Sequence, residues 1–284
     1  MVNVDLEYLK GFYPYQIVND KSKIKHIVKE YIELLVLEHL TTLPYIKKLS
    51  FIGGTNLRLV KGIQRFSEDL DFDCKNFTKD EFNAMTNSIV KFLNLNGFNA
   101  KLKDNINEEK LIAYRGNIVF PELLYNLGLT GHKEEKFLLK IEAQDQGIGY
   151  NNIKQQINRN GYNIIVPSPP DDILCSMKLA ALINRTKGRD FYDCMFLLQR
   201  TLPNLDFLEK RININSLDIL SSTLDTIISK TNMNNKQNDF KHLLFNSGSE
   251  ECINNFMEFF KKKINENSIT NLTEINQKKN SIKL

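Results

Sequence analysis

The stretch that decides the fold is GGTNLRLVKGIQRFSEDLDF, residues 53–72. Its first two residues, Gly53 and Gly54, directly follow a short apolar run at 49–52, a pattern typical of a strand that ends in a tight turn. Such a turn leaves main-chain N–H groups exposed, and exposed N–H groups bind phosphate. The start of the stretch therefore predicts a phosphate-binding turn.

Two carboxylates close the same stretch. Asp69 and Asp71 alternate with the apolar residues Leu70 and Phe72. Successive side chains of a β-strand point to opposite faces, so this alternation places both carboxylates on one face and both apolar groups in the core. Two like charges held that close need a cation. Together with the glycine turn, they predict a site for a nucleoside triphosphate and its metal ions.

The order of strand, glycine turn, short helix and carboxylate pair resembles the signature of the nucleotidyltransferase superfamily. More closely, GGTNLRL followed by RFSEDLDF resembles the first motif of the AbiEii/AbiGii toxin family of nucleotidyltransferases. A second block, KLAALINRTKGRDFYD at residues 178–193, is similar to a later motif of that family. Two matches in the expected order identify the chain as a member.

The resemblance and the pattern of the chain predict an α+β fold, in which a nucleotidyltransferase-like mixed β-sheet with flanking helices precedes a C-terminal helical bundle. PSPPDD, beginning at Pro167, indicates a boundary between an α/β domain with an N-terminal helix, 1–166, and a mainly helical domain, 167–284. Helical periodicity and capping signals predict helices at 22–40, 78–95, 172–185, from 189, 204–212, 216–230, 237–246 and 249–264. Further strands are expected at 98–104, 110–120 and 136–144.

The first motif supplies most of the expected site. The turn of Gly53, Gly54 and Thr55 is expected to hold the β- and γ-phosphates through its N–H groups and the Thr55 hydroxyl. Ser67 belongs to the same motif and is expected at the nucleotide. The motif also contains Arg58 and Arg65, and a structural role is favoured for Arg58.

A third carboxylate is expected beside the pair that holds the metal, Asp69 and Asp71. The nucleotidyltransferase fold places it on a later strand, and the resemblance nominates Glu142 in FLLKIEAQ as a catalytic metal ligand. An exposed strand residue paired with a lysine is the structural alternative for Glu142. Asp145 is the neighbouring rival.

The second motif is expected to bring cations to the triphosphate. Lys178 and Arg185 lie seven residues apart on the expected helix, hence on one side of it, and both are expected to face the nucleotide. Lys178 would neutralise the triphosphate as a mobile point charge. The resemblance makes Asp190 a functional residue, although a charge at a helix N-terminus would explain the residue type equally. Lys178 and Asp190 are thus the expected contribution of the second domain to the cleft.

The amino-acid composition limits the classes of protein to which the chain can belong. The chain has 284 residues, 42% apolar and 25% charged, with a net charge of +4, which is ordinary for a globular protein and permits contact with nucleic acid. No apolar stretch approaches the ~20 residues of a membrane span, and the N-terminus lacks the features of a signal peptide, so a cytoplasmic location and no membrane partner are expected. Scattered cysteines and histidines indicate neither a zinc site nor a disulfide framework.

The expected activity is transfer of a nucleoside monophosphate from an NTP to a hydroxyl of RNA, for which the tRNA 3′ end is one candidate, with Mg²⁺ or Mn²⁺ as cofactor. The family resemblance further implies a toxin of an abortive phage-infection system, neutralised by an antitoxin that is often a winged-helix repressor. Two alternatives stay open at this stage. One is a nucleotidyltransferase that modifies protein hydroxyls, and the other is a non-catalytic module that binds nucleotide or nucleic acid.

Overall fold

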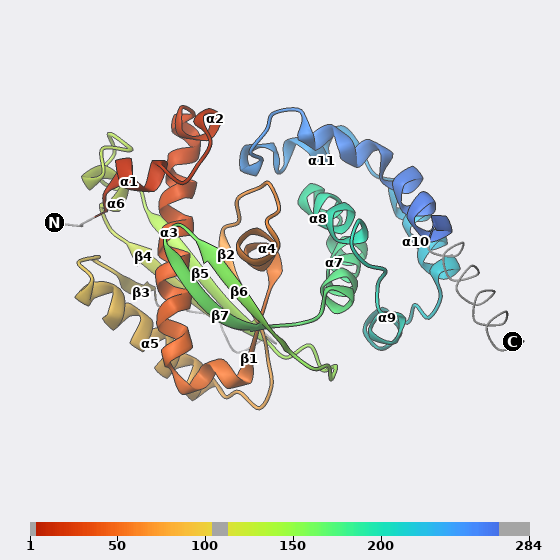
Figure 1. Cartoon of the computed structure of the whole chain (residues 1–284), viewed down its shortest axis with the longest axis horizontal. Coiled ribbons are helices and arrows are strands. Elements are labelled where there is room, and N and C mark those ends of the chain that lie inside the picture. The colour runs from red at the N-terminus through yellow and green to blue at the C-terminus, as the bar shows by residue number, and fades with distance from the viewer. Residues whose placement is uncertain (1–3, 104–112, 267–284) are drawn as a thin grey trace, which may run out of the picture. The chain divides into compact units, whose positions relative to one another are not determined.

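The computed structural model describes residues 4–103 and 113–266, and the chain divides into two compact units (Figure 1). Unit 1 extends to Pro170 and also includes the short segment His242–Asn246. Unit 2 begins at Asp171 and contains the remaining residues. The expected end of the first domain, residue 166, lies inside the strand β7 (Tyr162–Ser168), which unit 1 keeps whole.

Unit 1 is built on a five-stranded sheet in the order β1-β2-β5-β4-β3. Strands β2 and β5 are parallel, and the other neighbouring pairs are antiparallel. The expected α+β class with a mixed sheet is therefore confirmed, although parts of the strands expected at 98–104 and 110–120 lie outside the described residues. The strands are β1 (Leu49–Ile52), β2 (Asp69–Cys74), β3 (Lys101–Lys103), β4 (Tyr114–Phe120) and β5 (Phe137–Gln144).

Helices α3 (Lys21–Thr42) and α5 (Lys79–Leu95) pack in one hydrophobic core with the sheet. Helix α5 begins with the capping box that its sequence predicts: the Thr78 hydroxyl accepts from the Glu81 amide, and the Glu81 carboxylate accepts from the Thr78 amide. Leu70 and the other alternate strand residues enter this core. The face of the sheet that does not pack in this core, called here the open face, therefore carries the remaining residues of each strand.

The shorter helical elements of unit 1 connect these parts of the fold. They are α1 (Leu6–Lys10), α2 (Tyr15–Val18), the 3₁₀ turn Pro44–Lys48, α4 (Gly53–Asn56), the π-helical turn Leu57–Lys61 and α6 (Leu123–Asn126). The expected short helix is present as α4 and the π-helical turn, and it begins at the glycine pair itself, before the carboxylates.

A second, two-stranded sheet was not expected from the sequence. Strands β6 (Ile153–Arg159) and β7 pair as an antiparallel hairpin. Its turn is Asn160-Gly161, with φ angles of 50° and 84°. Positive φ at both central residues is what a two-residue hairpin turn of type I′ requires, and Asn-Gly supplies it most readily. The Asn-Gly dipeptide is the signal in the sequence for this hairpin.

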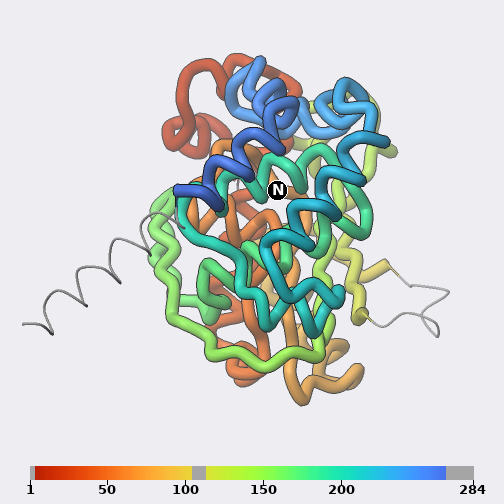
Figure 2. The backbone as a smooth tube through the Cα atoms, turned by 90° about the vertical axis from the view of Figure 1, so that its right-hand side faces the viewer, coloured from red at the N-terminus to blue at the C-terminus, as the bar shows by residue number. Residues whose placement is uncertain are grey.

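Unit 2 is helical (green to blue in Figure 2). The expected helix at 237–246 is wrong, because α11 ends at Asn238 and the chain then forms only a 3₁₀ turn at Lys241–Leu243 before it re-enters unit 1. None of the helices in the described parts of the chain is long and apolar enough to cross a membrane. The elements are α7 (Asp171–Arg185), α8 (Gly188–Leu198), α9 (Leu205–Ile212), α10 (Leu217–Ser229), α11 (Met233–Asn238), a 3₁₀ turn (Ser249–Asn255) and a helical stretch at 256–266.

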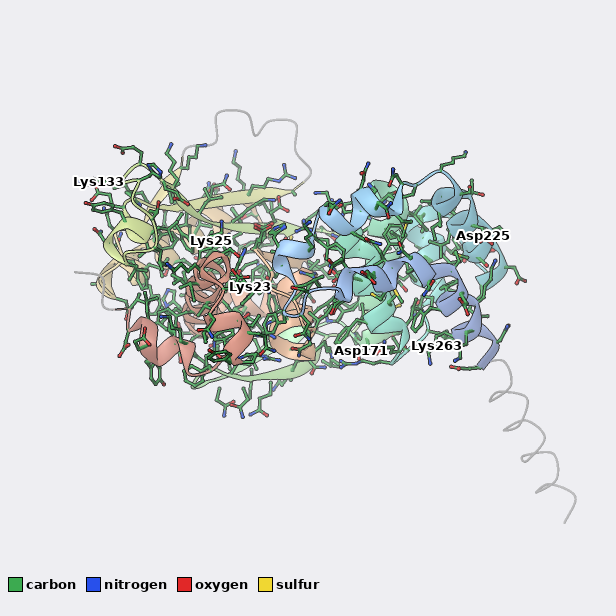
Figure 3. The ribbon with its side chains drawn as sticks, turned by 90° about the horizontal axis from the view of Figure 1, so that it is seen from above. Lys23, Lys25, Lys133, Asp171, Asp225 and Lys263 are labelled. Atoms are coloured by element: carbon green, nitrogen blue, oxygen red, sulfur yellow. The ribbon has the colours of Figure 1, made fainter. Side chains whose placement is uncertain are left out.

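The segment His242–Asn246, called here the return segment, adds to unit 1 from far along the chain. The Phe66 amide donates to the Leu243 carbonyl at 2.8 Å, so the first motif is hydrogen-bonded to it. The Lys23 ammonium of α3 (labelled in Figure 3) donates to the Leu244 carbonyl at 2.6 Å. These bonds fix the return segment between the first motif and α3.

Candidate active site

The glycine turn lies directly against the side chains of the first motif. Gly53 has a φ of 79°, and a Cβ there would come within 2.2 Å of Asp71 Oδ2. A Cβ on Gly54 would lie 2.6 Å from Ser67 Oγ and 2.7 Å from Arg65 Nη2. Neither position has room for a side chain. The geometry therefore explains why the glycine pair occurs together with the Arg-x-Ser-x-Asp-x-Asp sequence that follows.

The two carboxylates occupy the open face of β2. Asp69 and Asp71 are partly exposed, whereas Leu70 between them is fully buried, as the alternation predicted. In the parallel register, Asp71 is opposite Glu142 of β5 and Asp69 is opposite Lys140. Partners in neighbouring strands share a face, so Glu142 is the carboxylate that the sheet places beside the pair.

Two cationic side chains contact the Glu142 carboxylate. Its Oε1 accepts from Arg115 Nε of β4 and lies 2.8 Å from the Lys140 ammonium. The rival Asp145 lies past the end of β5, where its carboxylate accepts from the Gly147 amide at 2.7 Å. Within the described residues, no three His, Cys, Asp or Glu side chains are grouped as a metal site. A metal in this geometry would rely on the aspartate pair and on oxygens of the substrate.

Thr55 has a clear structural contact. It is fully buried, and its hydroxyl donates to the Asp69 carbonyl at 2.5 Å, which ties α4 to the start of β2. The next residue, Asn56, donates from its side-chain amide to the Phe51 carbonyl of β1 at 2.7 Å. The turn is therefore anchored to both strands that flank it. The contact of the Thr55 hydroxyl with phosphate stays a prediction.

Arg58 of the first motif lies in the protein interior, only 4% exposed. Its guanidinium donates to both carboxylate oxygens of Glu30, from Nε at 2.7 Å and from Nη2 at 3.1 Å. The ring of Phe245, from the return segment, lies 4.3 Å from the guanidinium carbon. A two-point ion pair covered by an aromatic ring satisfies the charge of the arginine within the core.

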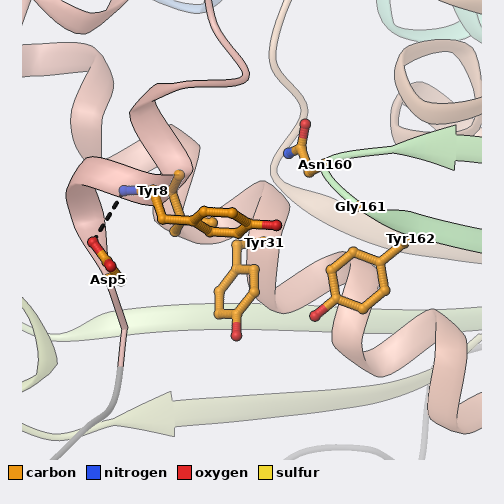
Figure 4. Close-up of a pocket in the computed structure, with 7 residues that line it drawn as sticks. Asp5, Tyr8, Tyr31, Asn160, Gly161 and Tyr162 are labelled. Atoms are coloured by element: carbon orange, nitrogen blue, oxygen red, sulfur yellow. Dashed lines mark hydrogen bonds between the residues drawn. The ribbon is translucent and has the colours of Figure 1, made fainter.

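A chain of hydrogen bonds leads from this ion pair to the hairpin turn. Tyr13 donates its hydroxyl hydrogen to Glu30 Oε1 at 2.9 Å, and the Asn160 side-chain amide donates to the Tyr13 hydroxyl oxygen at 2.9 Å. Asn160 also borders a cavity of about 320 Å³ that lies outside the first motif (Figure 4). The cavity is lined by Asp5, Tyr8, Leu9, Tyr31, Asn160, Gly161 and Tyr162.

A second cavity, of about 380 Å³, opens beside Asp69. Its charged lining residues are three lysines and three carboxylates, so the cavity would carry a net positive charge once a divalent ion is bound at Asp69. Burial lowers the pKa of His26, in the same wall, to about 4, and this imidazole is therefore neutral at pH 7. The charged residues are Lys25 (labelled in Figure 3), Lys29, Lys136, Glu68, Asp69 and Glu135.

In unit 2, the second motif forms two ion pairs between α7 and α8. The Lys178 ammonium lies 2.8 Å from Asp193 Oδ2. Arg185 donates to both oxygens of Asp190, at 2.8 Å and 2.7 Å. Both aspartates are fully buried, whereas the Arg185 side chain is 45% exposed. Asp193 ends the second motif block, three residues after Asp190 and on the same face of α8, and of the two the sequence favours Asp190 as the functional residue.

Several solved structures are similar to this fold. JHP933 from Helicobacter pylori is 19% identical, with a TM-score of 0.55, and the match covers 88% of this chain and 97% of that one. A putative nucleotidyltransferase from H. pylori is 21% identical, with a TM-score of 0.55 and coverages of 89% and 97%. MenT4, a nucleotidyltransferase toxin from Mycobacterium tuberculosis H37Rv, is 11% identical, with a TM-score of 0.51 and coverages of 91% and 99%. At these identities the likeness establishes the fold.

The fold and the motif site together define the class of protein, a nucleotidyltransferase. The family described as nucleotidyl transferase AbiEii toxin, type IV toxin–antitoxin system, matches residues 35–244, and the chain belongs to this family. A comparison with curated protein sequences gives no significant match. The matched region includes both motif blocks. Family membership and enzyme class, both expected from the sequence, are therefore confirmed.

Proposed function

We propose that this chain transfers a nucleoside monophosphate from an NTP to a hydroxyl of RNA, with the tRNA 3′ end as acceptor, in a reaction that requires Mg²⁺ or Mn²⁺. One observation carries the proposal. Asp71 and the glycine turn are in direct contact, so a triphosphate on the turn would bring its phosphate oxygens to the carboxylates. A turn that binds phosphate and a carboxylate pair that binds metal are the parts that phosphoryl chemistry needs.

The donor atoms fit a hard divalent cation. Mg²⁺ prefers oxygen ligands and is usually held by one or two carboxylates together with substrate phosphates. Asp69 and Asp71 offer such a pair, and Glu142, opposite Asp71, would join them by exchanging its contact with Arg115 or Lys140. When bound, the metal would lower the pKa of the attacking hydroxyl and neutralise charge on the leaving pyrophosphate.

The chain's own groups would then hold and orient the nucleotide. The amides of Gly53 and Gly54 would bind the β- and γ-phosphates. Ser67, which lies against Gly54, would contact the same triphosphate. Lys178 would neutralise the triphosphate.

Arg185, whose side chain is 45% exposed, would contact the nucleotide, while buried Asp190 holds that side chain by two hydrogen bonds. Asp190 would act on the nucleotide through Arg185.

The biological role follows the family. A type IV toxin–antitoxin family implies an antitoxin partner, and we propose that this partner is a winged-helix repressor. We further propose that the enzyme acts in the cytoplasm, where NTPs and tRNA are available, and that its transfer reaction arrests growth as part of phage defence.

The test uses purified protein, each α-labelled NTP in turn, Mg²⁺ or Mn²⁺, and total tRNA or cell lysate. Label should enter RNA with the wild type. It should fall by about 10²-fold or more in Asp69→Asn and Asp71→Asn. Asp80→Asn, an exposed aspartate of α5, is the matched control and should retain transfer. Label that survives RNase and is released by protease would indicate a protein acceptor, and full activity in Asp69→Asn would overturn the proposed site.

A further inference from the structure

The open face of the sheet carries cations next to the aspartate pair. The strand register places Asp69 opposite Lys140, Lys140 opposite Asn117, and Asn117 opposite Lys103. Because partners in neighbouring strands share a face, these side chains form one row from β2 to the edge strand β3. The row thus begins at a carboxylate of the first motif and ends at an exposed lysine.

A second row lies beside the first, two residues further along β2 and β5. Asp71 is opposite Glu142, and Glu142 is opposite Arg115. Lys101, two residues before Lys103, also shares the open face and is exposed. On β3, β4 and β5 this face therefore has four cations and one carboxylate among its charged residues. The whole chain has a net charge of only +4, so the charge here is locally concentrated.

We propose that these four residues, Lys101, Lys103, Arg115 and Lys140, named here the cationic face, bind the phosphate backbone of the acceptor RNA. The inference rests on the proposed function and adds to it the surface that receives the second substrate. Backbone phosphates are recognised mainly by lysine and arginine.

The position of the cationic face separates the two anionic substrates. The glycine turn that would hold the triphosphate follows β1, on one side of β2, whereas the cations lie on β5, β4 and β3, on the other side. Neighbouring strands are ~4.8 Å apart, so Lys103 lies roughly 14 Å across the sheet from Asp69. An RNA whose terminal hydroxyl is at the aspartate pair would therefore have its next phosphates over this face.

Binding is measured by fluorescence anisotropy with a labelled 12-nucleotide single-stranded RNA of mixed sequence, without NTP or metal. Lys101→Gln/Lys103→Gln should bind about tenfold more weakly at low salt, and the slope of log affinity against log salt should decrease by about 1.4. The matched control is Lys79→Gln/Lys91→Gln, which removes the same charge from exposed positions on α5. The control should bind as the wild type does.

Several results would overturn the proposal: a wild type that does not bind the RNA, an unaffected Lys101/Lys103 double variant, or equal loss in the control. Competition by poly-L-glutamate as strong as that by RNA would also overturn it, because the face would then not select a nucleic acid. The Tm of both double variants should still rise when NTP and Mg²⁺ are added, and this rise serves as the control that the variants are folded.

The transfer assay keeps the two proposals separate. A wild type that binds RNA through the cationic face but transfers no label to it would refute the proposed function and leave the inference standing. Equal KM values for RNA in wild type and Lys101→Gln/Lys103→Gln would refute the inference and leave the proposed function standing.

Discussion

Replacement of Arg58 by methionine should destabilise the protein strongly, because it leaves Glu30 buried without its counterion. The Glu30 carboxylate is 2% exposed and takes two hydrogen bonds from Arg58. Loss of one partner of a buried ion pair lowers the free energy of unfolding by about 3–5 kcal/mol. For a chain of this size, that corresponds to a decrease in Tm of roughly 6–20 °C.

Urea unfolding followed by circular dichroism measures this effect. In the double variant Glu30→Gln/Arg58→Met no carboxylate is stranded, so it should be more stable than Arg58→Met alone by about 1–3 kcal/mol. Lys10→Met provides the contrast, since Lys10 pairs with a Glu7 side chain that is 84% exposed, and its stability should barely change.

Two results would refute this reasoning. One is a loss in Arg58→Met of less than about 1 kcal/mol, which would mean that the buried pair contributes little. The other is a double variant whose loss equals the sum of the two single losses, which would mean that the two residues are not coupled. A fully folded Arg58→Met protein without transfer activity would instead assign the arginine a direct role in catalysis.

Three further predictions concern the site and its support. Gly53→Ala should reduce transfer by about 10²-fold or more, because its Cβ would displace the Asp71 carboxylate. The assay is label incorporation at saturating RNA, and normal activity would exclude the close approach of Gly53 to Asp71. Burial raises the pKa of Glu33 well above 4.5, so the stability contributed by its protonated carboxyl group is complete below pH 4.5 and is lost as the pH rises towards the raised pKa. In that window the free energy of unfolding of the wild type, relative to that of Glu33→Met, should decrease by about 1.4 kcal/mol per pH unit. If urea unfolding gives the same difference between the two proteins at pH 5 and pH 6, the prediction is wrong. Phe245→Ala should lower the free energy of unfolding by about 3–5 kcal/mol, whereas exposed Ile219→Ala should change it by less than about 0.5 kcal/mol, and similar melts for the two would show that the return segment contributes nothing.

The parts of the fold that the sequence predicted are those with local signals. The alternation around Leu70 indicated both the strand β2 and the face of its carboxylates, and Thr78 with Glu81 indicated the start of α5. The hairpin β6–β7 has little signal in the sequence, because its first strand is largely polar and exposed and only the Asn-Gly turn indicates it. A strand that buries little carries little hydrophobic pattern.

The remaining features depend on pairing between distant residues. Sequence left Glu142 and Asp145 as alternatives, and the register of β5 against β2 places Glu142 beside Asp71. The contact of Glu142 with Arg115 follows from a neighbouring strand that sequence spacing does not specify. Likewise, the bond of Phe66 to the return segment joins main-chain groups, which leave no residue pattern to recognise.

The return segment also sets the order in which the enzyme can be completed during synthesis. A ribosome releases residues 1–170 long before residues 242–246, and domains generally fold as units as they emerge. Until those last residues are made, Arg58 lacks the ring of Phe245 and the Phe66 amide lacks its acceptor. A chain that terminates before residue 242 would therefore carry both motif sequences without a finished unit 1, so the surroundings of the first motif are complete only after residue 246 has been translated.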